Sequence, residues 1–353
     1  MVAATGGADV PPRYLRPEAA AEDVAADGEA EIPIIDLQML LDSRDEEESA
    51  RLHQACQEWG FFQLINHGVP HEVTEGMKAM VEGFFELPAE TKKQFAQEPG
   101  QLDGYGQLFV VSEDQKLDWA DILFLHTQPP QLRNMRFWPD KPATFRSASL
   151  VPLFIACAAT HSEPYGHWIA AAVKNIADRL LAIMSKNLGL EAGVIAEKCV
   201  GGVQAVRMNY YPPCAEAHKV VGFAPHSDSD LLTLVLQVNE VQGLQIERND
   251  RWIPVKPAEG ALVVNVGDVL EILTNGRYRS IEHRAMISTE KERMSVAAFH
   301  SPSVHATIGP LTEILAAHEE ALYKTVDHES FMKLFFSAKL EGKSFLQRMK
   351  LMA

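Results

Sequence analysis

The spacing of hydrophobic residues differs between the two halves of the chain. Before about residue 200, apolar side chains recur every three to four positions, which places them on one face of a helix. Glycines stand directly after two of these patterns, where a helix commonly ends. The pattern predicts helices at 45–59, at 73–84 and at about 166–188, and buried strands at 32–37 and 61–68.

After about residue 200, apolar residues alternate with polar ones, as in strands that have one buried face. Asn275-Gly276 predicts a tight hairpin, and short strands at this spacing favour a sandwich or jelly roll. Residues 311–349 return to a helical pattern. We therefore expect an α+β protein. Its predicted strands are VQAVRMNYY, LLTLVLQ, LQIERN, ALVVNVGD, YRSIEHRAMI and RMSVAAFH.

Composition excludes several classes of protein. Of 353 residues, 46% are apolar and 23% charged, as in soluble globular proteins, and no apolar run reaches the roughly 18 residues of a membrane span. A net charge of −16 without a basic cluster argues against nucleic acid and anionic membranes as partners. The N-terminus lacks the apolar segment of a signal peptide, and the four cysteines form no CxxC pair. We expect a cytoplasmic monomer that acts on a small molecule.

His226 and Asp228 are the first candidates for chemistry. Residues two apart on a strand point to the same face, so both side chains would enter the β core together. His283, on a later predicted strand, can supply a third ligand. Two histidines and one carboxylate on one face of a metal form the triad of non-haem Fe(II) oxygenases. The alternative is a hydrogen-bonded His–Asp pair beside a core histidine.

Arg293, Ser295 and Phe299 share one face of the last predicted strand. An arginine inside a β core needs an anionic partner, because an unpaired buried charge is costly. A guanidinium and a hydroxyl together match a carboxylate, such as the distal one of 2-oxoglutarate. The alternative is a surface arginine on an edge strand.

Asn209 and Tyr211 share a face of the strand that Pro212-Pro213 ends. If that face is the inner one, both side chains can hydrogen-bond the same dicarboxylate. The alternative is that Tyr-Pro-Pro is only the exit of a strand.

Taken in this order, the segments closely resemble the plant family of soluble 2-oxoglutarate- and Fe(II)-dependent dioxygenases. The most similar members are flavonoid dioxygenases and enzymes like codeine demethylase and norcoclaurine synthase. The resemblance covers nearly the whole chain, and its most specific segments are NYYPPC, HSD, NVGD, LTNGRYRSIEHR and ERMSVAAF. It implies a double-stranded β-helix, which is a cupin-like jelly roll, with a helical N-terminal region and a C-terminal helix. It also implies iron at His226, Asp228 and His283, and the 2-oxoglutarate carboxylate at Arg293 and Ser295 with help from Tyr211 and Asn209.

The resemblance implies an oxidoreductase that uses O2 to convert 2-oxoglutarate to succinate and CO2, with ascorbate as a reductant. The same reaction would hydroxylate, desaturate or demethylate a small plant metabolite. Phe299, Tyr105 and Phe124 are candidates for the substrate pocket, although each can equally be a core aromatic. Two other functions remain open: an idle jelly roll that only binds a metabolite, and an oxidase of this fold that uses iron and ascorbate without 2-oxoglutarate.

We expect the chain to consist of six segments. The apolar segment 147–162 looks inserted relative to the family, either as a buried turn or helix or as an artefact of the gene model. The expected segments are a disordered leader (1–30), an N-terminal dioxygenase domain (31–146), the insertion (147–162), the long helix and its connection (163–200), the β-helix domain (201–304) and a C-terminal helical segment (305–353).

Overall fold

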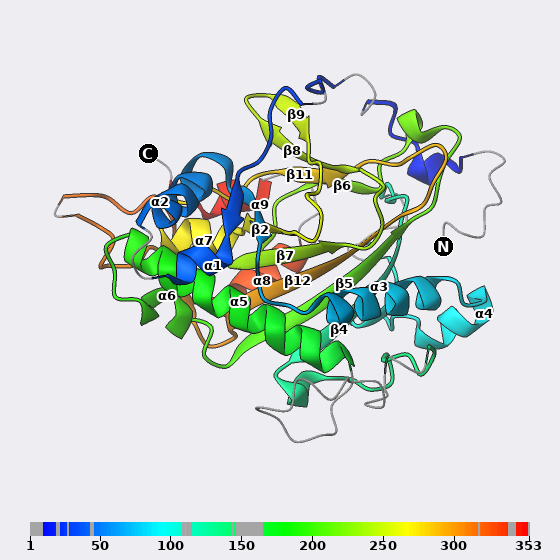
Figure 1. Cartoon of the computed structure of the whole chain (residues 1–353), viewed down its shortest axis with the longest axis horizontal. Helices are drawn as coiled ribbons and strands as arrows, with labels where there is room; N and C mark the ends of the chain where they lie inside the picture. The colour runs from blue at the N-terminus through cyan, green and yellow to red at the C-terminus, as the bar shows by residue number, and fades with distance from the viewer. Residues whose placement is uncertain are drawn as a thin grey trace.

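Two facing sheets form the centre of the computed structural model, and helices cover the outer side of the larger sheet (Figure 1). The structure describes residues 10–18, 22–26, 28–42, 46–107, 110, 115–142, 145, 165–316, 318–337 and 344–351. The apolar segment 147–162 lies outside these described residues. Among the helices described, none has both the length and the apolarity that crossing a bilayer requires.

The larger sheet contains, within the described residues, eight strands in the order β1-β2-β10-β7-β12-β5-β4-β3. Strands β1 and β2 pair in parallel, and the other neighbours pair antiparallel. The strands are β1 (Ile34–Asp36), β2 (Phe61–Ile65), β3 (Gly104–Gly106), β4 (Asp121–Gln128), β5 (Gly202–Tyr211), β7 (Leu232–Gln237), β10 (Leu262–Val266) and β12 (Arg293–Ser303).

The smaller sheet has the strand order β6-β11-β8-β9. Its strands are β6 (Phe223–His226), β8 (Leu244–Arg248), β9 (Arg251–Pro254) and β11 (His283–Ala285). Consecutive strands β5 to β8 alternate between the two sheets, as in a double-stranded β-helix. The α+β jelly roll expected from the sequence is therefore confirmed.

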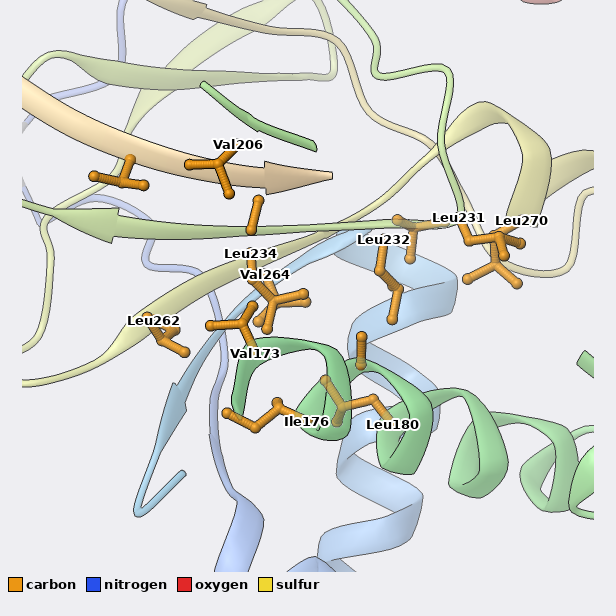
Figure 2. Close-up of a cluster of buried hydrophobic side chains, with 14 of the residues drawn as sticks. Val173, Ile176, Leu180, Val206, Leu231, Leu232, Leu234, Leu262, Val264 and Leu270 are labelled. Carbon is orange, nitrogen blue, oxygen red and sulfur yellow. The ribbon is translucent and has the colours of Figure 1, made fainter. Parts of the chain in front are cut away.

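The long helix α5 (Tyr165–Asn187) packs beside α3 (His71–Phe85) on the outer face of the larger sheet (Figure 1). Figure 2 shows Val173, Ile176 and Leu180 of α5 pointing toward Leu234 and Val264 of the sheet. Burying each such side chain contributes about 1.5–3 kcal/mol, so this contact holds the sheet in place from outside. The inner face is thereby left to the functional side chains.

The remaining helices are short. They are α1 (Leu37–Leu41), α2 (Glu46–Gln54), α4 (Ala89–Lys92), α6 (Gly193–Glu197), α7 (Asp268–Leu273), α8 (His328–Ser337) and α9 (Ser344–Met349). The helix predicted at 45–59 is confirmed as α2, which continues through a π-helical turn (Ala55–Trp59). Gly60 ends it with a φ of 59°, in the left-handed region that glycine favours.

Two sequence-based expectations about the C-terminal half are wrong. Asn275-Gly276 does not join two strands, because both residues follow α7 and give the chain the positive φ angles of a helix exit. A helix also does not begin near residue 311. A short strand pair, β13 (Thr307–Ile308) and β14 (Val326–Asp327), comes first, and helix starts only at His328.

The leader was expected to be disordered, but its described residues pack on the β core. The amide of Ala25 donates to the carbonyl of Trp252 at 2.8 Å, and the amide of Trp252 donates to Asp23 at 2.9 Å. These bonds extend the smaller sheet beyond β9. Nearer the start, the ring of Tyr14 packs edge-on against Trp119 at 5.2 Å. For these described residues the expectation of disorder is wrong.

Replacement of Gly60 by alanine should destabilise the protein more than the same change at Gly189. Both glycines end helices with positive φ, so both variants suffer the same backbone strain. A Cβ at Gly60 would lie 2.1 Å from the carbonyl oxygen of Arg279, whereas one at Gly189 has nothing within 4 Å. Overpacking of this kind costs about 1–3 kcal/mol more, measurable by urea unfolding. Equal losses for the two variants would contradict this packing.

Candidate active site

The pairing of β6 with β11 places two histidines side by side. His283 lies directly opposite His226 in the antiparallel register, and their ring centroids are 4.2 Å apart. Asp228 follows β6 by two residues, and its Oδ1 lies 3.5 Å from Nε2 of His226 and 3.7 Å from Nε2 of His283. The three side chains are all buried. One ligand atom from each can lie within 4.8 Å of the others, the spacing of a metal site.

Backbone carbonyls fix which ring nitrogen of each histidine carries the proton. Nδ1 of His226 donates to the carbonyl of Ala224 at 2.8 Å, and Nδ1 of His283 donates to that of Ile281 at 3.1 Å. Because a carbonyl can only accept, each Nδ1 carries a proton, and in the neutral form of either ring the lone pair is on Nε2, which faces Asp228. This is the arrangement that orients histidine ligands of metals.

Asp228 is held by two donors on the carboxylate oxygen that faces away from the histidines. The Thr233 hydroxyl donates to Oδ2 at 2.6 Å, and the Asn265 amide donates to the same atom at 2.8 Å. Thr233 lies on β7 and Asn265 on β10, so Asp228 is fixed by the larger sheet while both histidines belong to the smaller one. The cluster therefore joins the two sheets.

The start of α7 anchors the loop that carries Asp228. The amide of Asp268 donates to the carbonyl of Asp228 at 2.7 Å, and the amide of Gly267 donates to that of Leu231 at 3.0 Å. A Cβ at Gly267 would lie 2.1 Å from the carbonyl oxygen of Asp230. Only glycine permits this close approach.

Burial and mutual interaction set the charges of the cluster. Burial would raise the pKa of Asp228, but the facing histidines and the Thr233 hydroxyl outweigh it and lower that pKa. Burial, followed by the neighbouring His226, lowers the pKa of His283 to about 4. The cluster is therefore one carboxylate with a neutral imidazole at His283 near pH 7.

These residues fit a divalent transition metal. Nε2 of His226 is buried and makes no hydrogen bond, which is costly unless another partner occupies that side. Two imidazole nitrogens and one carboxylate oxygen on one side of a metal match the facial triad of non-haem Fe(II) sites, which leaves coordination positions open.

Arg293 lies on the same inner face as Phe299, six residues further along β12. It is 3% exposed, and burial lowers its pKa. Its Nη2 donates to Oε1 of Gln237 at 3.3 Å, its guanidinium lies 5.2 Å from the ring centroid of Tyr211, and its Nε has no hydrogen-bond partner. No carboxylate among the described residues forms an ion pair with it. Its buried charge therefore lacks an anionic partner among the described residues.

Three other predicted residues surround this arginine or support it. Tyr211 pairs with Arg293 across β5 and β12, and Asn209 pairs with Ser295. The amide of Asn209 donates to the Ser295 hydroxyl at 3.1 Å, which leaves the hydroxyl proton of Ser295 available to a ligand. Gly243 lies against Arg293, where a Cβ would be 2.8 Å from Cδ of the arginine.

A cavity of about 230 Å³ opens beside His226 and Asp228. Phe124 and Phe299 line it, with ring centroids 6.4 Å apart and ring planes inclined by 29°. Tyr105 does not line it. The Tyr105 ring is buried against Phe84, and its hydroxyl donates to Asp121. Two of the three aromatic residues expected near a substrate are thus at the cavity, and the third belongs to the core.

The cavity also contains polar residues to which the sequence analysis assigned no role. Arg207 is 8% exposed, stacks over Phe223 and Phe299, and has an Nε atom without a hydrogen-bond partner. Burial raises the pKa of Asp230 to about 7, and the Ser301 hydroxyl donates to its carboxylate. Arg207 lies two residues before Asn209 on the same face of β5, so the alternating pattern in the sequence could have identified it as an inward-facing residue. The other polar residues without an assigned role that line the cavity are His126, Ser227, Ser229 and His328.

Comparisons with known proteins agree with this geometry. Residues 32–141 match the family model described as non-haem dioxygenase in morphine synthesis N-terminal, and residues 202–302 match the 2OG-Fe(II) oxygenase superfamily. The chain is 45% identical to 2-oxoglutarate-dependent dioxygenase 11 of Oryza sativa subsp. japonica, over 97% of this chain and 92% of that one. It is 42% identical to oxoglutarate-dependent flavonoid 7-O-demethylase 1 of Ocimum basilicum, over 98% and 88%.

A solved structure is similar over nearly the whole length. The crystal structure of JOX2 in complex with 2OG, Fe and JA has 32% sequence identity to this chain and a TM-score of 0.87. The alignment covers 99% of this chain and 96% of that one.

Replacement of Thr233 by valine should weaken Fe(II) binding by about 10- to 100-fold, because Asp228 loses a hydrogen bond that orients it. Competition with a chelator under anaerobic conditions measures this affinity. Thr127→Val is the matched control, since Thr127 is equally buried but bonds to Gln204. An equal loss of affinity in both variants would mean that Thr233 acts only through stability.

Proposed function

The chain belongs to the 2-oxoglutarate- and Fe(II)-dependent oxygenase family, and we propose that its organic substrate is a small, flat, largely apolar plant metabolite. As a family member it is an oxidoreductase that couples oxidation of this substrate to decarboxylation of 2-oxoglutarate, with O2 as co-substrate. The single observation that carries the proposal is the convergence of His226, Asp228 and His283 on one point, where His226 and Asp228 also line an aromatic cavity.

We assign the iron to these three side chains. The fixed Nδ1 protons leave Nε2 of both histidines ready to ligate, and Thr233 and Asn265 leave only Oδ1 of Asp228 facing them. Bound iron supplies the activation of O2, which protein side chains cannot perform. The protein itself holds three ligands on one side of the iron and excludes water from the opposite side.

We assign the distal carboxylate of 2-oxoglutarate to Arg293 and Ser295. The support is a buried guanidinium that has no carboxylate partner among the described residues, beside a hydroxyl free to donate. Tyr211 and Asn209 support these two side chains from the paired strand β5. A bidentate guanidinium contact would orient the dicarboxylate so that its keto-acid end points toward the triad.

The cavity supports the choice of substrate class. Its volume of about 230 Å³ suits a molecule of a few rings, and the flat faces of Phe124 and Phe299 favour a planar one. Among relatives, the flavonoid demethylase is named for a flat aromatic compound. Arg207 adds a cation that can hold an oxygen atom of such a substrate.

The two alternative functions lack support. An idle binding protein has no need of a complete His–Asp–His triad together with the buried Arg293. An oxidase that works without 2-oxoglutarate would leave the charge of Arg293 without an anion. Hydroxylation, desaturation and demethylation are all compatible with the proposed site.

A coupled assay tests the proposal. The protein is loaded anaerobically with Fe(II) and carboxyl-labelled 2-oxoglutarate, air is admitted, and plant phenolics, alkaloids and hormones are screened for release of labelled CO2. We expect at least one compound to stimulate release and to be oxidised, and His226→Ala to abolish both. Unchanged release by His226→Ala would refute the assignment of the iron. His71→Ala, which alters an exposed histidine, is the control.

Arg293→Ala should raise the KM for 2-oxoglutarate at least about 30-fold, since losing one partner of a buried charged pair costs about 2 kcal/mol or more. The affinity for Fe(II) alone should stay within about threefold. Steady-state succinate formation and chelator competition give the two values. Arg251→Ala, which removes an arginine paired with Asp23 and Glu29, is the control. An unchanged KM would place the co-substrate elsewhere.

A further inference from the structure

Helix α8 brings a histidine from the C-terminal region to the cavity wall. His328 is its first residue, and Met332 and Phe335 lie one and two turns later on the same face. All three line the cavity beside the proposed iron site. The amide of His328 donates to the carbonyl of Ala306 at 2.9 Å, which fixes the start of the helix near the end of β12.

The imidazole of His328 presents an acceptor. Its Nδ1 lies 3.1 Å from the carbonyl of Ser303 and must donate to it, so the ring proton is on Nδ1 and Nε2 carries a lone pair. Burial lowers the pKa of His328, which keeps the ring neutral. The side chain is 2% exposed, and its Nε2 is buried without any hydrogen-bond partner.

A buried acceptor such as Nε2 of His328 is expected to have a hydrogen-bond donor as its partner. A buried polar atom without one costs about 1–3 kcal/mol, and folded proteins seldom leave such atoms unsatisfied. Of the cavity-lining residues that the structure describes, His226, Arg207 and His328 carry orphaned nitrogen atoms. The atom on His226 is assigned to iron. Two unpartnered nitrogen atoms remain. Nε of Arg207 is a donor, and Nε2 of His328 is an acceptor.

We propose that Nε2 of His328 accepts a hydrogen bond from a hydroxyl group of the organic substrate and thereby selects hydroxylated aromatic substrates. This inference rests on the proposed function, because it concerns the same cavity. A neutral acceptor cannot hold a carboxylate, and the Arg207 cation on the same cavity wall disfavours a protonated amine. A phenolic or alcoholic hydroxyl is the donor that remains. His328 is thus a positioning and specificity-determining residue.

Two probes of nearly equal shape test the hydroxyl preference. 2-Naphthol and 2-methylnaphthalene differ only by a hydroxyl and a methyl group. Calorimetry measures their binding to the anaerobic protein loaded with Fe(II) and 2-oxoglutarate, so no turnover is needed. In His328→Leu, the ratio of naphthol affinity to methylnaphthalene affinity should fall about tenfold, as expected for one lost hydrogen bond. His328→Gln, which keeps an acceptor, should recover part of the ratio.

Met332→Leu is the matched control, because it alters the same helix face without changing a polar atom. Both affinities should shift together, leaving the ratio within about twofold of the original. An unchanged ratio in His328→Leu, binding of neither probe by the original protein, or an equal fall in Met332→Leu would overturn the proposal. A failure of coupled CO2 release with intact naphthol selectivity would instead count against the proposed function alone.

Discussion

The register between β6 and β11 is the constraint on which the site depends. It sets His226 opposite His283, and Asp228 reaches the same point because the chain turns directly after β6. A shift of one residue in either strand would turn a histidine to the other face of the sheet. The register is fixed from outside the site: His283 also pairs with Ile246 of β8, and the amide of Gly222 donates to the carbonyl of Ala285.

The same cluster links the two sheets energetically. Asp228 is supported by Thr233 and Asn265 from the larger sheet and faces two histidines of the smaller one. The unpartnered Nε2 of His226 opposes folding unless a partner binds it. Metal binding at the proposed site would therefore also stabilise the β-helix, and the helices on the outer face stabilise the larger sheet from the other side.

Much of the fold and the metal cluster could be predicted from local sequence. The alternating pattern predicted the strands and placed Arg293 and Ser295 on one face of β12. His226 and Asp228 were also expected to share a strand, but β6 ends at His226, and Asp228 reaches the same point from the turn that follows. His328 carried no such signal, because it reaches the cavity only through the packing of α8. Tyr105 was expected to line the substrate pocket but lies in the core, because the sequence alone does not distinguish an aromatic residue of a pocket from one of the core. Asn275-Gly276 was misread because positive φ angles serve helix exits as well as hairpins.

Anaerobic absorption spectroscopy can show whether His226, Asp228 and His283 hold iron, because Fe(II) chelated by a keto acid has a charge-transfer band that neither component has alone. We expect the band to appear when both Fe(II) and 2-oxoglutarate are added, to saturate at one iron per chain, and to be lost in Asp228→Ala. A band of equal strength in Asp228→Ala, or tight binding of both components without any band, would contradict a ferrous centre at these three side chains.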